Sequence, residues 1–152
     1  HSAAEADKMA GRVPEFQITL KVEFDGDVNV GQIADIVKIK PTLCQSYRDA
    51  GYTRIGHKKL PAAWWYAYPS PREYKPGWKL NERIEEFFDL FPPDGLASLS
   101  DFVRRNGGSV ALAVNIYFFG GRVPEMCICG RAKDFLYLLN ADIMINMNEE
   151  NA

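Results

Sequence analysis

The stretch Phe16-Gln-Ile-Thr-Leu-Lys-Val-Glu-Phe24 alternates apolar and polar residues without a break. Successive side chains of a β-strand point to opposite faces, so the five apolar side chains share one face and the four polar ones share the other. A half-buried strand of this kind is typical of a sheet that is covered on one side. The stretch therefore predicts a sheet with one face against a core.

Apolar residues at helical spacing predict four helices beyond this strand. Asn29 can cap the first, and Pro41 requires that helix to stop before it, because the residue preceding a proline is pushed out of the α region. Pro92-Pro93 ends the second helix, and Gly107-Gly108 ends the third. The expected helices cover residues 30–37, 81–91, 96–106 and about 132–139.

Further strands are predicted from alternation and turn residues. In the run 62–68, Trp64, Tyr66 and Tyr68 share one face. Gly120-Gly121 is expected to form a hairpin turn between two strands. The remaining expected strands are 110–118, 123–129 and 143–147. Periodicity is lost between Pro41 and Pro61, which predicts a long loop of about twenty residues, and loops longer than ~12–15 residues are usually functional or disordered.

These elements predict one α+β domain with a largely antiparallel five-stranded sheet and helices packed mainly on one face. The βα start and the helix–strand end suggest a ferredoxin-like arrangement. A chain of 152 residues is long enough to bury one core. His1 followed by small and polar residues ahead of Met9 has the composition of an expression-tag remnant. The expected division is 1–8 tag remnant, 9–148 domain and 149–152 tail.

Positive charge and large aromatic side chains concentrate between Lys38 and Arg83. This segment holds ten of the eighteen Lys and Arg residues, all three Trp and five of the seven Tyr. Only Asp49, Glu73 and Glu82 oppose that charge, which leaves a net charge of +7 in a chain of formal charge −2. Because summed charge steers association, the segment predicts a docking surface.

Two irregular stretches of this segment, 41–60 and 69–79, carry the residues expected to contact a partner. Tyr, Trp and Arg are enriched at protein-interface hot spots, because they bury a large area with few rotors and keep a polar handle. Aromatic rings interleaved with cations also suit single-stranded nucleic acid. Trp64 is assigned to the core instead. The predicted partner-binding residues are Arg48, Tyr52, Arg54, His57, Lys58, Lys59, Arg72, Tyr74, Lys75 and Trp78.

No catalytic constellation emerges from the sequence. His57 is the one histidine after the first eight residues, and a general base needs an orienting acid within reach. Its neighbours Lys58 and Lys59 are cations instead, which favours a solvated loop histidine. Ser98 and Ser100 have no neighbouring base. No catalytic residue is predicted.

Cys127-x-Cys129 places two thiols on one face of the predicted strand 123–129. A zinc site normally takes four ligands, and only Cys44 and His57, both in the long loop, remain to complete one. Three cysteines, an odd number, argue against a disulfide framework. Packing of the two thiols beneath a helix is the favoured interpretation, so neither a metal nor a cofactor is predicted.

The order of elements resembles a known bacterial family. The resemblance rests on a first strand, a short helix ending Ile39-Lys40-Pro41-Thr42, a polar loop with Arg48 and Gly51, and a strand bearing Trp64-Trp65. It continues through the segments 80–91, 110–128, 132–139 and 141–147. Over residues 14–148 the chain resembles the domain of unknown function family 4279. That resemblance implies a bacterial, soluble, non-membrane protein and supplies no activity.

The function expected from these observations is a non-catalytic, cytoplasmic protein-binding module, immunity-like or accessory, with an acidic protein partner. The sequence pI of about 5.7 lies far below the value above ~9 expected of a dedicated nucleic-acid binder. Binding of a nucleic acid or another polyanion through the same region is the alternative. The immunity-like class is an analogy with other small standalone bacterial domains.

Overall fold

The computed structural model describes residues 11–53, 56–70 and 73–150, with only the backbone at residues 49, 50, 52, 53 and 57. The predicted alternating strand, β1 (Glu15–Phe24), lies at the centre of the main sheet. It pairs antiparallel with β5 (Ala62–Tyr68) along one edge and with β7 (Ser109–Phe119) along the other. The apolar side chains from Phe16 to Phe24 are all at least 97% buried. The prediction of a strand with one core face is confirmed.

The main sheet has six strands and is mixed. Its order is β2-β5-β1-β7-β8, and β6 (Lys75–Pro76) pairs with the start of β1. β8 (Asp142–Glu150) runs parallel to β7, because helix α5 carries the chain back between them and such a crossover leaves the two strands parallel. The expected five strands are corrected to six; the sheet is largely antiparallel as predicted, and the β7–β8 pairing makes it mixed. The elements β1, α2, β2, β5, α3–α4 and β7 follow the β-α-β-β-α-β order.

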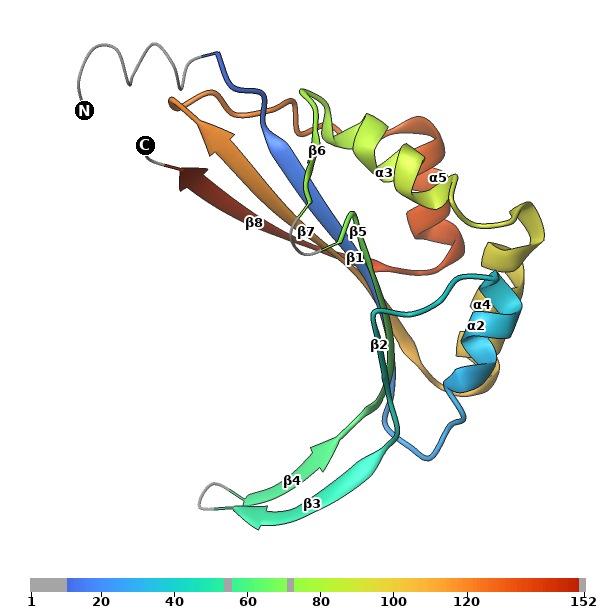
Figure 1. Ribbon diagram of the computed structural model, residues 1–152. Coiled ribbons are helices and arrows are strands. Elements are labelled where there is room, and N and C mark those ends of the chain that lie inside the picture. Colours follow the sequence, from blue (N-terminus) through green and yellow to red (C-terminus); the bar gives the residue numbers. More distant parts are fainter. Residues whose placement is uncertain (1–10, 54–55, 71–72, 151–152) are drawn as a thin grey trace.

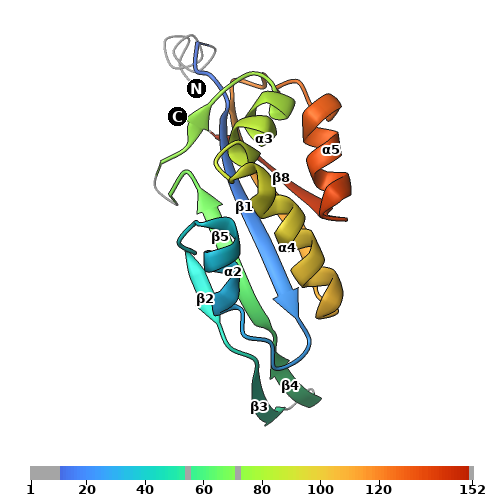
Figure 2. The same cartoon turned by 90° about the vertical axis from the view of Figure 1, so that its right-hand side faces the viewer.

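The helices of the described residues all cover one face of this sheet (Figures 1 and 2). They are α2 (Gly31–Val37), α3 (Leu80–Phe88), α4 (Pro93–Arg105) and α5 (Gly130–Leu138). Trp64 on β5 and Phe87 on α3 are fully buried in the core between the two layers. The prediction of an α+β fold with helices on one face is confirmed, as is the assignment of Trp64 to the core.

The helices lie close to their predicted positions, but two end signals differ: Val30 rather than Asn29 is the N-cap of α2, and α3 ends at Phe88, so that Pro93 begins the next helix. The backbone N–H of Gly31 donates to Asn29 Oδ1 at 3.2 Å, and α2 ends ahead of Lys38, which is left-handed with φ 57°. α4 begins at Pro93, where a missing N–H costs nothing. Beyond α4 the chain turns through Gly108, where an added Cβ would lie 2.4 Å from the Phe24 ring. Gly108 therefore allows α4 and β7 to pack against the end of β1.

The predicted long loop is wrong, because the region 41–61 contains three strands. β2 (Leu43–Gln45) pairs with β5 at the edge of the main sheet. β3 (Arg48–Thr53) and β4 (Gly56–Leu60) pair only with each other. We call this two-stranded ribbon the arm; it extends from the lower end of the sheet, away from the helices (Figure 1). Apolar and polar residues do not alternate regularly over residues 48–60, so the sequence carried no strand signal there.

The predicted hairpin partner of β7 at 123–129 is also wrong. The chain does turn at Gly120-Gly121, both of which have positive φ, and a single bridge joins Phe119 to Arg122. No ladder follows, because β1 and β8 already occupy the two edges of β7. Residues 123–129 cross instead to the start of α3, where Lys79 and Glu125 form an isolated bridge.

Candidate functional site

The arm carries the exposed cations of the first predicted stretch. Arg48 begins β3, and Lys58 and Lys59 lie in β4, all three with exposed side chains. Among the residues whose side chains are described, none forms an ion pair with these three cations. The sequence of residues 48–60 has four cations and one carboxylate, a net charge of +3. The arm therefore presents positive charge to solvent.

Other predicted residues of this stretch are placed less completely. The backbones of Tyr52 and His57 face each other across the arm, but their side chains lie outside the described residues, as do Arg54 and Arg72 entirely. The base of the arm is fixed by the Gln45 side chain, which donates from Nε2 to the Pro61 carbonyl at 2.9 Å. The position of the arm is thus set where β2 and β5 meet the ribbon.

The second predicted stretch lies at the other end of β1. Lys75 pairs with Phe16 near the start of that strand, whereas the arm directly precedes Ala62, the β5 residue that pairs with the end of β1 at Phe24. A strand of ten residues spans roughly 30 Å. The basic segment of the sequence therefore forms two separate regions, and the structure does not bring Lys75 together with the arm.

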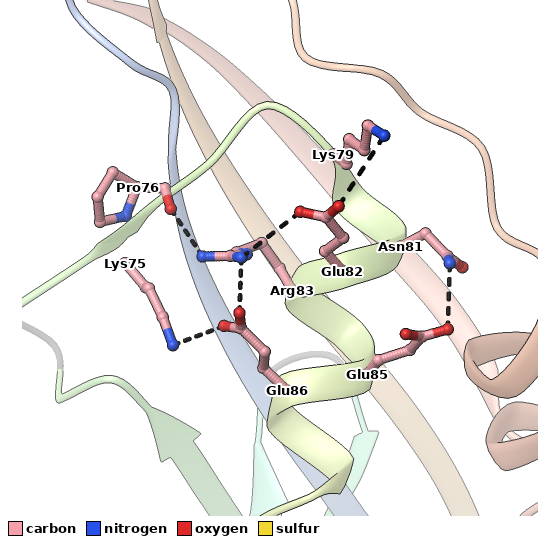
Figure 3. Close-up of polar contacts among 8 residues, drawn as sticks. All are labelled: Lys75, Pro76, Lys79, Asn81, Glu82, Arg83, Glu85 and Glu86. Atoms are coloured by element: carbon pink, nitrogen blue, oxygen red, sulfur yellow. Dashed lines mark hydrogen bonds and ion pairs between the residues drawn. The ribbon is translucent and has the colours of Figure 1, made fainter.

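Lys75 and Lys79 of this second region form ion pairs within the molecule, and Arg83 of α3 lies beside them (Figure 3). Arg83 donates to the Pro76 carbonyl at 2.8 Å and to Glu86 Oε1 at 2.7 Å. Lys75 Nζ lies 2.6 Å from Glu86 Oε2. An added Cβ on Gly77 would come within 3.1 Å of the Arg83 side chain, so the glycine leaves room for the guanidinium. We call this group the α3 corner: Lys75, Pro76, Gly77, Lys79, Glu82, Arg83 and Glu86.

The predicted aromatic residues beside the α3 corner are also engaged. Arg122 lies over the Trp78 ring at 4.8 Å from its centroid. The Tyr74 ring packs on Tyr117 with centroids 4.5 Å apart, and the Tyr74 hydroxyl donates to the Tyr117 hydroxyl at 3.5 Å. This hydrogen bond, with burial and the nearby Glu150, raises the pKa of Tyr117 to about 12. Tyr117 is thus neutral at pH 7 and supplies a hydroxyl group rather than charge.

A surface that the sequence did not single out is the open face of the sheet, opposite the helices (Figure 1). Its floor is a row of small side chains, in which Thr19 faces Ala67 on one neighbouring strand and Ala113 on the other. Trp65 and Lys21 stand on one side of this row, with Lys21 Nζ 4.4 Å from the Trp65 ring centroid. The result is a hollow of about 540 Å³ across the sheet.

Amide side chains line the other side of the hollow. Gln17 faces Asn115, and Asn115 faces Asn146, which donates to Asn115 Oδ1 at 3.2 Å. Each amide offers both donor and acceptor atoms. Lys21 is the one charged residue among those that line the hollow. The open face can therefore receive polar peptide groups, and its charge favours an acidic segment.

A weak sequence signal for this hollow existed. Gln17 and Thr19 on the polar face of the first strand are uncharged, whereas Lys21 and Glu23 on the same face are charged. In the structure Gln17 and Thr19 are no more than 9% exposed. Asn115 interrupts a run of apolar residues in β7, and asparagine is depleted from strands. The small residues and amides that line the hollow could not be predicted as neighbours, because their positions depend on the register between strands far apart in the sequence.

Other kinds of site are not assembled in the described part of the chain. No group of three or more His, Cys, Asp or Glu side chains there is placed to hold a metal ion. Among the same residues, no helix is long and apolar enough to cross a membrane.

Comparisons of the chain with models of protein families, with curated proteins and with solved structures find no match. The resemblance to the domain of unknown function family 4279 therefore stays a prediction.

Proposed function

We propose that this protein is a bacterial, cytoplasmic, non-catalytic binding module, immunity-like or accessory, that docks an acidic protein partner with its arm and the open face of its sheet. The main support for this proposal is the arm. A two-stranded ribbon is at best marginally stable alone in water; among the described residues the arm pairs with no further strand, and its sequence has a net charge of +3. A ribbon of this kind gains its packing when a partner covers it.

The open face supports the same proposal. The arm extends from the end of the sheet toward the side opposite the helices (Figure 1), so one partner can contact the arm and the hollow together. Lys21 in the hollow and Lys58 on the arm have the same sign. Charge complementarity of this kind raises association rates and selects against basic partners.

The first test is co-expression with the product of the neighbouring gene, followed by affinity measurement on the purified pair. The variant Lys58→Glu/Lys59→Glu is expected to weaken binding by roughly ten- to a hundredfold, because two attractive contacts become repulsive. The matched control, Arg104→Glu/Lys133→Glu, reverses two exposed charges on the helical layer and leaves the affinity unchanged. Failure to recover any stoichiometric protein partner would contradict the proposal.

The open face is tested separately with Ala113→Phe. Phenylalanine suits a strand and would fill the hollow without entering the core, since Ala113 faces away from the helices. Binding is expected to weaken about tenfold, an effect that only a minority of single interface positions reach. An unchanged affinity would restrict the interface to the arm.

Nucleic acid or another polyanion is the second candidate, supported by the exposed cations Arg48, Lys58 and Lys59 on the arm. Neutralisation of phosphates makes affinity fall steeply and linearly with salt on logarithmic axes. Fluorescence anisotropy with a labelled single-stranded oligonucleotide over a salt series is the measurement. Absence of binding at low salt would eliminate this candidate.

A further inference from the structure

Cys127 and Cys129 lie in the segment that crosses from β7 to α5, and that segment is fixed to the start of α3. The Glu125 N–H donates to the Trp78 carbonyl at 2.7 Å, and the Leu80 N–H donates to the Glu125 carbonyl at 3.0 Å. The Cys129 N–H donates to Asn81 Oδ1 at 2.9 Å. Backbone anchors on either side of Cys127 therefore hold both cysteines in place.

The expected packing of these thiols beneath a helix is wrong, because both are exposed. No strand forms at 123–129 to direct them into the core. They line one hollow of about 310 Å³, which is also lined by Lys79, Asn81, Glu82, Glu85 and Glu125. The two cysteines are two residues apart in the chain and open into the same hollow, so one ion in the hollow can contact both thiols.

We propose that Cys127 and Cys129 form a two-thiolate binding site for a soft monovalent metal ion of the copper(I) type. Thiolates are the ligands that copper(I) selects, and copper(I) accepts two-coordinate geometry. A structural zinc ion takes four ligands, whereas the described residues form no cluster of three or more potential ligands here. The carboxylates of Glu85 and Glu125 add negative charge to the hollow, which attracts a cation.

Binding proceeds by exchange of protons for the metal. Each thiol loses its proton to solvent, two sulfur–copper bonds form, and no electron is transferred. Because two protons leave, the affinity at this site rises with pH. The site is independent of the arm and of any protein partner, since it lies beside the start of α3.

The test is an anaerobic competition for copper(I) against a chromogenic chelator, with the full chain. The wild-type chain is expected to take up one ion per molecule. Cys127→Ser and Cys129→Ser are each expected to lower the copper(I) affinity more than about 100-fold. Mutation of a residue that only hydrogen-bonds to a metal ligand already lowers metal affinity by about 10–100-fold, and loss of a ligand itself costs more. Cys44→Ser is the matched control, since Cys44 is also exposed but lies on β2. Equal loss in the control, or none in the two variants, would overturn the proposal.

A second measurement needs no variant. The wild-type chain is alkylated with iodoacetamide with and without copper(I), and the modified cysteines are identified by mass spectrometry. Protection of Cys127 and Cys129 but not of Cys44 supports the site. Equal alkylation of all three cysteines with and without the ion would overturn it.

Discussion

In the α3 corner, Lys75, Lys79 and Arg83 lie within 4 Å of the carboxylates of Glu82 or Glu86. On the arm, Arg48 and Lys58 have no ion-pair partner among the side chains that the structure describes. Both regions come from the one basic segment of the sequence. A charge count therefore measures what a segment contains, whereas the availability of each cation for a partner depends on what the fold brings beside it.

The sharpest test of this difference is to remove the arm. Replacement of residues 48–60 by a short Gly-Ser linker is expected to weaken partner binding more than about 100-fold, because the central contacts of an interface carry most of its energy. The free energy of unfolding of the body is expected to change by less than about 1 kcal/mol, since surface changes away from the core usually cost little. Binding assays and thermal unfolding of the same preparation give both values. A large loss of stability would show that the arm belongs to the core.

The α3 corner is expected to behave in the opposite way. Arg83 has a side chain only 12% exposed, and Arg83→Ala removes hydrogen bonds to Pro76 and Glu86. Hydrogen bonds to charged groups contribute about 1.5–3 kcal/mol, so we expect a loss of about 2 kcal/mol. For a chain of this size, that lowers Tm by about 4–8 °C. Calorimetry measures the shift, and partner affinity at a temperature well below Tm is expected to stay unchanged.

A matched pair of lysines compares the regions directly. Lys75→Met breaks a half-exposed ion pair with Glu86 and is expected to cost about 0.5 kcal/mol, in the range of surface ion pairs. Lys58→Met on the arm breaks none in the described structure and is expected to leave unfolding unchanged. Chemical denaturation of the two variants side by side measures the difference. Equal effects on stability would remove the distinction between paired and available cations.

The smallest expected effect concerns the tyrosine pair beside the α3 corner. The pKa of Tyr117 is raised to about 12, first by its hydrogen bond with Tyr74, so the folded state holds the proton more tightly than the unfolded state. This contribution to stability is complete below pH 10 and is lost as pH rises from 10 through 12. Ultraviolet titration of phenolate is expected to show one group near pH 12, and Tyr74→Phe to move it toward 10. A group that stays near 12 in the variant would assign the shift to burial.

Much of the fold could be predicted because the apolar residues of its buried faces recur at regular intervals along the sequence. The alternation from Phe16 to Phe24 and the helical stripe around Ile84 and Phe87 both carry the period of the element they form. The arm could not be predicted in this way, since its residues show no regular alternation of apolar and polar side chains. The parallel pairing of β8 depends on which edge of β7 remains free, and the local sequence does not determine this.

The candidate site was predicted in part. The cations Arg48, Lys58 and Lys59 were predicted from charge alone, and they do lie exposed on the arm. Tyr74 and Lys75 were grouped with them by nearness in sequence, although β1 separates the two regions. The hollow of the open face was not found, because its members Thr19, Ala67 and Ala113 become neighbours only through strand register.

The central position of β1 also governs when this protein can fold. Its first strand leaves the ribosome early, yet one of its two neighbours, β7, ends at Phe119. At roughly 5–20 residues per second, about 95 further residues take on the order of 5–20 s to be synthesised. During that interval the apolar face of β1 lacks its neighbour on one side. The nascent chain is therefore expected to need chaperone protection until β7 emerges, whereas α5 and β8 join a sheet that has already formed.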